Sequence, residues 1–174
     1  MNFDTRYLYI ILGLIVIMNL FSGSFDILGV LLTLPGVLVA ITFHEYAHAL
    51  AAYKLGDDTP KVQGRLNLNP LTHLDPIAVV LLVFTHIGWG KPVEINPNNF
   101  DRKISARAGE AIVAAAGPIM NILLAFVIAI IFYALQVFAT GFAIGTQTGM
   151  IIMTMIQYAV IVNVGLGVFN LIPL

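Results

Sequence analysis

The apolar positions of the chain gather into four long runs separated by polar connections. The runs cover residues 7–21, 27–55, 110–138 and 149–172. The last three approach or exceed the about 20 mostly apolar residues that a helix needs to cross a bilayer. The first is shorter and contains Asn19, and its leading residues lack the positive charge of a signal peptide because Asp4 balances Arg6. The pattern therefore predicts about four transmembrane helices, with the first one retained.

A different pattern fills the connection between the second and third runs. Residues 77–89 are apolar but too few to span a bilayer, which is typical of a re-entrant or interfacial segment. Apolar and polar residues alternate in 65–68 and in 93–95, with the period of a half-buried strand. We therefore expect a small membrane-associated β-sheet beside the helices.

Composition excludes several other classes of protein. Of the 174 residues, 59% are hydrophobic and only 10% are charged, whereas a typical soluble domain is about 25% charged. A soluble fold of this size would expose much of that apolar surface and aggregate. The net charge of −1 argues against nucleic acid as a partner, and the lack of cysteine excludes disulfides and thiolate metal sites. The predicted fold class is an all-α polytopic membrane protein, with residues 1–174 in one membrane-embedded unit.

The eight Lys and Arg residues predict how the spans are oriented. None lies in the short connections 22–26 and 139–148, and all but Arg6 lie in the connection 53–109. With four alternating spans, every positive charge falls on one side of the membrane, and by the positive-inside rule that side is cytoplasmic. We therefore expect a multi-pass protein of the cell membrane, with its N-terminus and the 53–109 connection in the cytoplasm.

The second apolar run contains a cluster of ionisable residues, His44-Glu45-Tyr46-Ala47-His48. Residues four apart lie on nearly the same face of a helix, so His44 and His48 can bind one zinc ion. Glu45 is close enough to take a proton from a water on that metal. Such residues at a helix end can also be merely structural, but ionisable residues inside a membrane span are costly and usually mark function. The cluster therefore predicts a site for one Zn2+ per chain.

Two asparagines in the later spans, Asn121 and Asn170, need polar partners because lipid offers none. Each could form an interhelical hydrogen bond. Each could instead bind a substrate carbonyl or stabilise the oxyanion formed during hydrolysis. Both roles stay open for both residues.

The competing function is that of a non-catalytic membrane protein, either a metal-binding scaffold or a transport component. A transporter is expected to show inverted repeats and polar residues along a path across the membrane. Here the ionisable cluster is confined to one end of its span, and the acid that a hydrolase needs, Glu45, is present. The pattern therefore favours hydrolysis.

Several motifs occur in an order that is specific to one family. They are His44–His48, Gly64–Pro70, His73–Pro76, Gly88–Val93, Asn96–Pro97, Ala116–Asn121 and Phe169–Leu174. With these motifs the chain resembles the site-2 protease family of intramembrane zinc metalloproteases, in its compact bacterial and archaeal branch.

The resemblance implies three core helices around zinc, a membrane-associated sheet, and hydrolysis of a peptide bond in or near a substrate's transmembrane segment. It implies that His44 and His48 are metal ligands and that Glu45 is the catalytic base. It also implies positions near the zinc for Asn121 and Asn170. The expected partners are a membrane-spanning protein substrate and the lipid bilayer.

The sequence departs from the family pattern at its last residue. In the family, the motif that matches Asn170–Pro173 continues into an Asp-Gly pair whose aspartate is the third protein ligand, but the sequence stops at Leu174. We therefore expect the third ligand beyond Leu174, in which case this chain is a truncated and inactive piece. Asp75 and His73 could replace that ligand by their chemistry alone, but Asp75 precedes a proline and is better explained as a turn or helix cap.

Overall fold

The computed structural model describes residues 10, 13–14, 17–18, 21, 26–75, 78, 90–101 and 103–172. Most of the predicted first span and nearly all of the predicted re-entrant segment lie outside these residues. Three of the described helices are long and apolar enough to cross a membrane: α2 (Ile27–Lys54), α6 (Ala106–Phe138) and α8 (Gln147–Phe169). The chain is thus a mostly helical, multi-pass membrane protein.

Each long helix begins at a side chain that caps its first turn. Asp26, Ser105 and Thr146 accept hydrogen bonds from the backbone N–H three residues further on, at 2.9, 3.3 and 2.9 Å. These bonds satisfy donors that a helix start leaves without partners. The cap at Ser105 explains why α6 starts four residues before the apolar run that predicted it.

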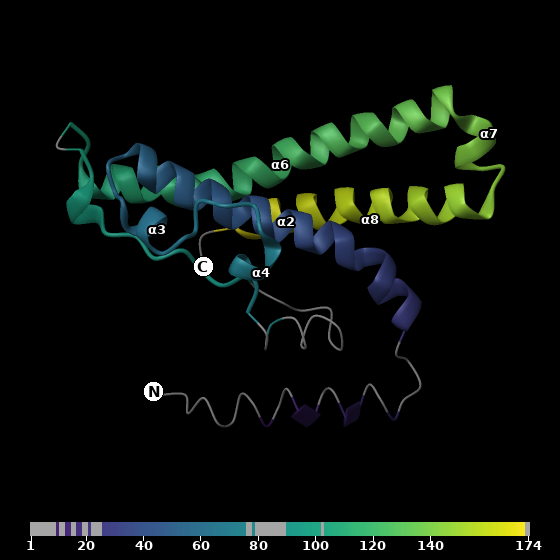
Figure 1. Ribbon diagram of the computed structural model, residues 1–174, viewed down its shortest axis with the longest axis horizontal. Helices are drawn as coiled ribbons and strands as arrows, with labels where there is room; N and C mark the ends of the chain where they lie inside the picture. The colour runs from purple at the N-terminus through teal and green to yellow at the C-terminus, as the bar shows by residue number, and fades with distance from the viewer. Residues whose placement is uncertain are drawn as a thin grey trace.

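The three long helices pack against one another as a bundle (Figure 1). The α6 and α8 helices run antiparallel and are joined by the short α7 (Thr140–Ala143), while α2 contacts both. Small residues permit this close approach, because a Cβ added at Gly36 would lie only 2.7 Å from the Ala159 Cα. The outward faces stay apolar, as at Phe126, whose side chain is 66% exposed.

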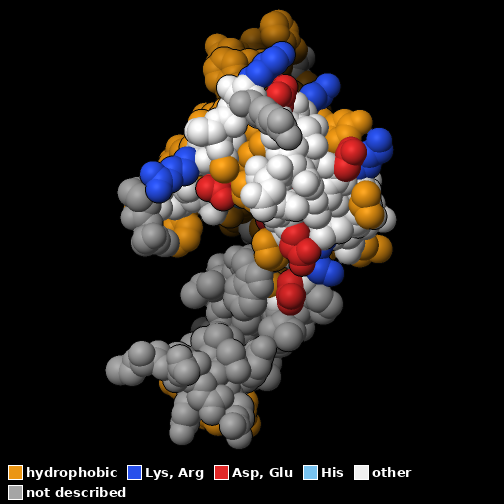
Figure 2. Space-filling model, turned by 90° about the vertical axis from the view of Figure 1, so that its left-hand side faces the viewer, with side chains coloured by type: hydrophobic (Ala, Val, Ile, Leu, Met, Phe, Trp, Pro, Cys, Tyr) orange, Lys and Arg blue, Asp and Glu red, His pale blue; other side chains and the backbone are white. Residues whose placement is uncertain are grey.

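The connection between α2 and α6 carries three short helical turns, α3 (Thr59–Val62), α4 (Pro70–His73) and η1 (Pro97–Asn99). Figure 2 looks onto the end of the bundle where α2 ends and α6 begins. Charged side chains of both signs gather there. This distribution is typical of a helix bundle whose charged end lies at a membrane–water interface.

The predicted β-sheet is wrong for the residues that the structure describes. They contain no strand, and the extended backbone forms one isolated bridge, between Leu74 and Gly90. Side chains take the partners that a strand ladder would need: the Arg65 guanidinium donates to the Thr72 carbonyl and the Asn67 amide to the Gly64 carbonyl. Hydrogen bonds from side chains to nearby backbone groups compete with sheet formation in this way.

The second predicted strand, 93–95, fails for a related reason. The backbone N–H of Val93 donates to the Glu45 carboxylate, and the N–H of Asn96 donates to Asp57 at 2.7 Å. Side chains of other elements thus fasten the segment 90–96 to α2 and to the residues that follow it.

Asp57 holds this connection together from a buried position. Its carboxylate accepts the Thr59 hydroxyl at 2.6 Å and the Asn99 amide at 2.9 Å, in addition to the Asn96 N–H. Burial raises the pKa of the Asp57 carboxyl, but the hydrogen bonds outweigh burial and leave that pKa below its ordinary value. The carboxylate thus ties η1 and α3 to the end of α2.

Candidate metal centre

The helical spacing of His44 and His48 brings their side chains together as predicted. Their Nε2 atoms lie 3.0 Å apart on the inner face of α2, and His44 is only 6% exposed. Two nitrogens that each lie about 2.0–2.1 Å from one tetrahedral zinc are separated by about 3.3 Å. The pair therefore fits two positions of a zinc coordination shell after a shift of a few tenths of an ångström.

The other ring nitrogen of each histidine is fixed by an oxygen. The Nδ1 of His44 lies 2.5 Å from the Asn121 Oδ1, and the Nδ1 of His48 lies 2.6 Å from the Val113 carbonyl oxygen. Both oxygens only accept hydrogen bonds, so we assign a proton to each Nδ1. In the neutral rings the two Nε2 lone pairs then face each other, an arrangement that a cation between them stabilises.

Asn121 is oriented in turn by acceptors on α2 and α8. It is fully buried, and its Nδ2 donates to the Ala40 carbonyl at 3.1 Å and to the Asn163 Oδ1 at 2.9 Å. The Nδ2 of Asn163 donates to the Ala159 carbonyl at 2.8 Å, which fixes that amide as well. A chain of hydrogen bonds thus runs from α8 through α6 to a metal-ligand candidate on α2.

Sequence reasoning missed Asn163, although the same signal was present. It is a fully buried asparagine inside the apolar helix α8, and lipid cannot satisfy an amide. Asn163 needs a polar partner for the same reason as Asn121 and Asn170.

Gly117 closes the site on the side of α6. A Cβ at this position would collide with the rings of both His44 and His48. The α6 backbone therefore lies directly against the imidazoles, and only glycine leaves room for them.

Glu45 points into a cavity of about 200 Å3 that His44 also lines. The other lining residues are Ile41, Gly90, Leu166, Phe169 and Asn170. Glu45 is 8% exposed, and its carboxylate accepts a hydrogen bond from the Val93 N–H next to the positive charge of Arg65. The cavity therefore places an acid and a metal-ligand candidate beside the same enclosed space.

The remaining candidates lie in different surroundings. Asn170 lines the cavity and donates from Nδ2 to the Leu166 carbonyl at 2.8 Å. His73 is buried with its Nε2 2.8 Å from the Asn67 carbonyl oxygen, and Asp75 accepts from the Ala78 N–H at 3.1 Å. In the part of the chain that the structure describes, no third His, Asp or Glu joins the two histidines as a ligand group.

Two converging imidazoles beside a buried acid, set in a bundle of apolar helices, are typical of a metallohydrolase.

No family model matches the chain, and no solved structure matches it. Two curated relatives do. The chain is 37% identical over 138 residues to "Putative zinc metalloprotease YwhC" of Bacillus subtilis (strain 168), a match covering 79% of this chain and 61% of that protein.

The second relative is "Putative zinc metalloprotease Rip2" of Mycolicibacterium smegmatis, 32% identical over 101 residues, which are 55% of this chain and 37% of that protein. The chain thus spans about three fifths of the first relative's length and less of the second's. It is a homologue of bacterial proteins whose names describe zinc metalloproteases. The resemblance that its motifs predicted is confirmed by these relatives.

Proposed function

We propose that the full-length protein is an intramembrane zinc metalloprotease that hydrolyses a peptide bond in or near the transmembrane segment of a protein substrate. The observation that carries this proposal is the meeting of three side chains within the helix bundle. The Nε2 atoms of His44 and His48 converge, and Glu45 shares a cavity with His44. The names of the two relatives support zinc and proteolysis.

His44 and His48 would hold one zinc ion per chain, with a third protein ligand from outside the described residues. Bound zinc supplies a water whose pKa is lowered to about 7 and polarises the peptide carbonyl. The donor set fits this ion, because both Nε2 atoms are unprotonated when each Nδ1 donates to an oxygen.

Glu45 would act as general base and then as general acid. Its carboxylate takes a proton from the attacking water and passes it to the leaving nitrogen of the cleaved bond. The Val93 N–H holds the carboxylate in position, next to the positive charge of Arg65. Because a helix hides its peptide bonds, the substrate must unwind locally to reach this cavity.

The two asparagines would act differently. The hydrogen bonds of Asn121 support the interhelical role, in which its oxygen orients the His44 ring. Asn170 lines the cavity beside Glu45 and stays a candidate for contact with the substrate carbonyl.

The positive-inside rule supports a cytoplasmic position for the charged end of the bundle in the cell membrane. His44 and His48 lie in the C-terminal half of α2, which ends at Lys54 and leads into the polar connection. A short path for water from the cytoplasm would therefore reach the site.

The proposal is tested with the full-length protein in liposomes and a set of labelled transmembrane peptides. Wild-type protein is expected to cleave at least one peptide, and Glu45→Gln is expected to abolish cleavage while binding zinc as before. Cleavage that survives in the zinc-loaded Glu45→Gln protein would overturn the role of Glu45. A zinc-loaded wild-type protein that cleaves no peptide, in a set that a related protease does cleave, would support the scaffold alternative.

A further inference from the structure

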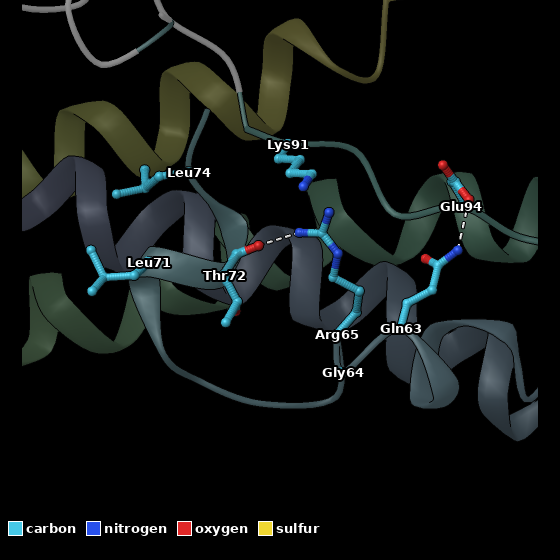
Figure 3. A pocket seen from close by; sticks show the side chains of 8 residues that line it. All are labelled: Gln63, Gly64, Arg65, Leu71, Thr72, Leu74, Lys91 and Glu94. Carbon is cyan, nitrogen blue, oxygen red and sulfur yellow. Dashed lines mark hydrogen bonds between the residues drawn. The ribbon is translucent and has the colours of Figure 1, made fainter. Parts of the chain in front are cut away.

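A second, larger cavity of about 470 Å3 lies in the connection between α2 and α6 (Figure 3). Its walls are Gln63, Gly64, Arg65, Leu71, Thr72, Leu74, Lys91 and Glu94. The catalytic role proposed above uses Arg65 only through its charge and uses none of the others. The proposed catalysis therefore leaves most of this cavity without a role.

Two cations face each other in this cavity. Figure 3 shows the Lys91 ammonium and the Arg65 guanidinium pointing toward the same space. The guanidinium donates to the Thr72 carbonyl, and among the residues that the structure describes neither cation forms an ion pair with a carboxylate. Arg65 is only 8% exposed, so its charge has lost much of its hydration.

The acid in the cavity wall does not neutralise both cations. The Oε2 of Glu94 accepts a hydrogen bond from the Gln63 Nε2 at 2.6 Å, and Figure 3 shows this pair on the far side of Arg65 from Thr72. With two cations against one acid, the walls carry a net positive charge. A carboxylate between Arg65 and Lys91 would accept charge-assisted hydrogen bonds from both.

The second cavity adjoins the catalytic one through consecutive residues. Gly90 lines the cavity that holds Glu45, and Lys91 lines the charged cavity. Consecutive Cα atoms lie about 3.8 Å apart, and the chain continues from Lys91 to Val93, whose N–H contacts Glu45. In an extended peptide bound beside this segment, each residue would span about 3.3 Å of the way from one cavity toward the other.

We propose that Arg65 and Lys91 form a subsite that binds the carboxylate of an Asp or Glu side chain in the substrate, within about three residues of the cleaved bond. This inference rests on the proposed function, because it assigns the chain a peptide substrate. A peptide is favoured over a lipid phosphate because two consecutive residues, Gly90 and Lys91, line the cavity of Glu45 and the charged cavity.

The test separates binding from cleavage. Full-length, zinc-loaded Glu45→Gln protein in neutral phosphatidylcholine liposomes is titrated with fluorescent transmembrane peptides chosen because the wild type cleaves them. Each peptide is made with Asp, Asn or Lys at each of the three positions on either side of the cleaved bond. At one of these positions, Asp is expected to bind about tenfold more tightly than Asn, the size of one charge-assisted contact.

Charge reversal identifies the residue responsible. Adding Lys91→Glu is expected to remove the preference for Asp and to favour the Lys peptide. The milder Lys91→Gln should remove the preference without reversing it. Lys103→Glu makes the same charge change at an exposed site that lines neither cavity, and should leave the preference intact.

Three outcomes would overturn the subsite. The first is equal binding of Asp and Asn peptides at every position. The second is an equal loss of affinity for all peptides in the Lys91→Gln protein. The third is an effect of Lys91→Gln that follows the phosphatidylglycerol content of the liposomes and not the peptide sequence, which would assign the cavity to a lipid headgroup. If the wild type cleaves none of the peptides, the proposed function itself has failed, and that result is distinct from the other three.

Discussion

The Oδ1 of Asn121 on α6 lies 2.5 Å from the Nδ1 of His44 on α2. Because this oxygen accepts a hydrogen bond, it directs the proton of the imidazole to Nδ1 and leaves Nε2 free for a metal. One residue thus couples the packing of two apolar helices to the chemistry of the site.

Replacing Asn121 with Leu should weaken zinc binding about 10- to 100-fold, the usual cost of losing an outer partner of a metal-bound histidine. Asn121→Asp keeps an oxygen acceptor and should lose less zinc affinity than Asn121→Leu. Competition with a chelating dye measures both affinities, and circular dichroism checks that the helices remain. Equal affinities in wild type and Asn121→Leu would refute the positioning role.

Asn163→Leu should also weaken zinc binding, but by less, because Asn163 acts only through Asn121. The effects of Asn163→Leu and Asn121→Leu should therefore be far from additive in the double variant. Gln157 lies on the same helix and serves as the control position. Strict additivity of the two effects would show that the two amides act separately.

Gly117→Ala should disrupt the centre, because its Cβ would overlap both imidazole rings. We expect both zinc affinity and thermal stability to fall. Gly165→Ala is the matched control, since nothing lies within 4 Å of a Cβ at that position. A helical Gly→Ala change there should be neutral or slightly stabilising. Similar behaviour of the two variants would contradict the close contact.

Asp57 predicts a pH dependence of stability. Its pKa is lower in the folded protein, so its stabilising effect is present above the ordinary carboxyl pKa and is lost as pH falls through the folded-state value. Asp57→Asn should cost about 1–3 kcal/mol at neutral pH and should flatten the decline in melting temperature below about pH 4. Thermal unfolding of wild type and Asp57→Asn in detergent, between neutral and acidic pH, measures both effects. An unchanged acid profile in Asp57→Asn would exclude the role.

The parts of the fold that depend on hydrophobic length could be predicted from the sequence. The apolar run 27–55 coincides with α2, Ile27–Lys54, and the spacing of His44 and His48 places both rings together. These features follow from the bilayer thickness and the helical repeat, which act locally.

The parts that depend on contacts between distant segments could not be predicted. Residues 65–68 alternate like a strand, but the Arg65 and Asn67 side chains bond to nearby carbonyls instead. The partners of the two Nδ1 atoms come from α6, and no local pattern reveals them. Asn163 could have been found, because an amide in an apolar span always needs a partner.

The zinc content of the purified full-length protein tests the central claim most directly. Mass spectrometry of the metal is expected to give one zinc per chain for wild type and for Glu45→Gln. His44→Ala and His48→Ala, shown to be folded by circular dichroism, are expected to retain little. Zinc at the wild-type level in either histidine variant would show that the metal is held elsewhere and would contradict the account.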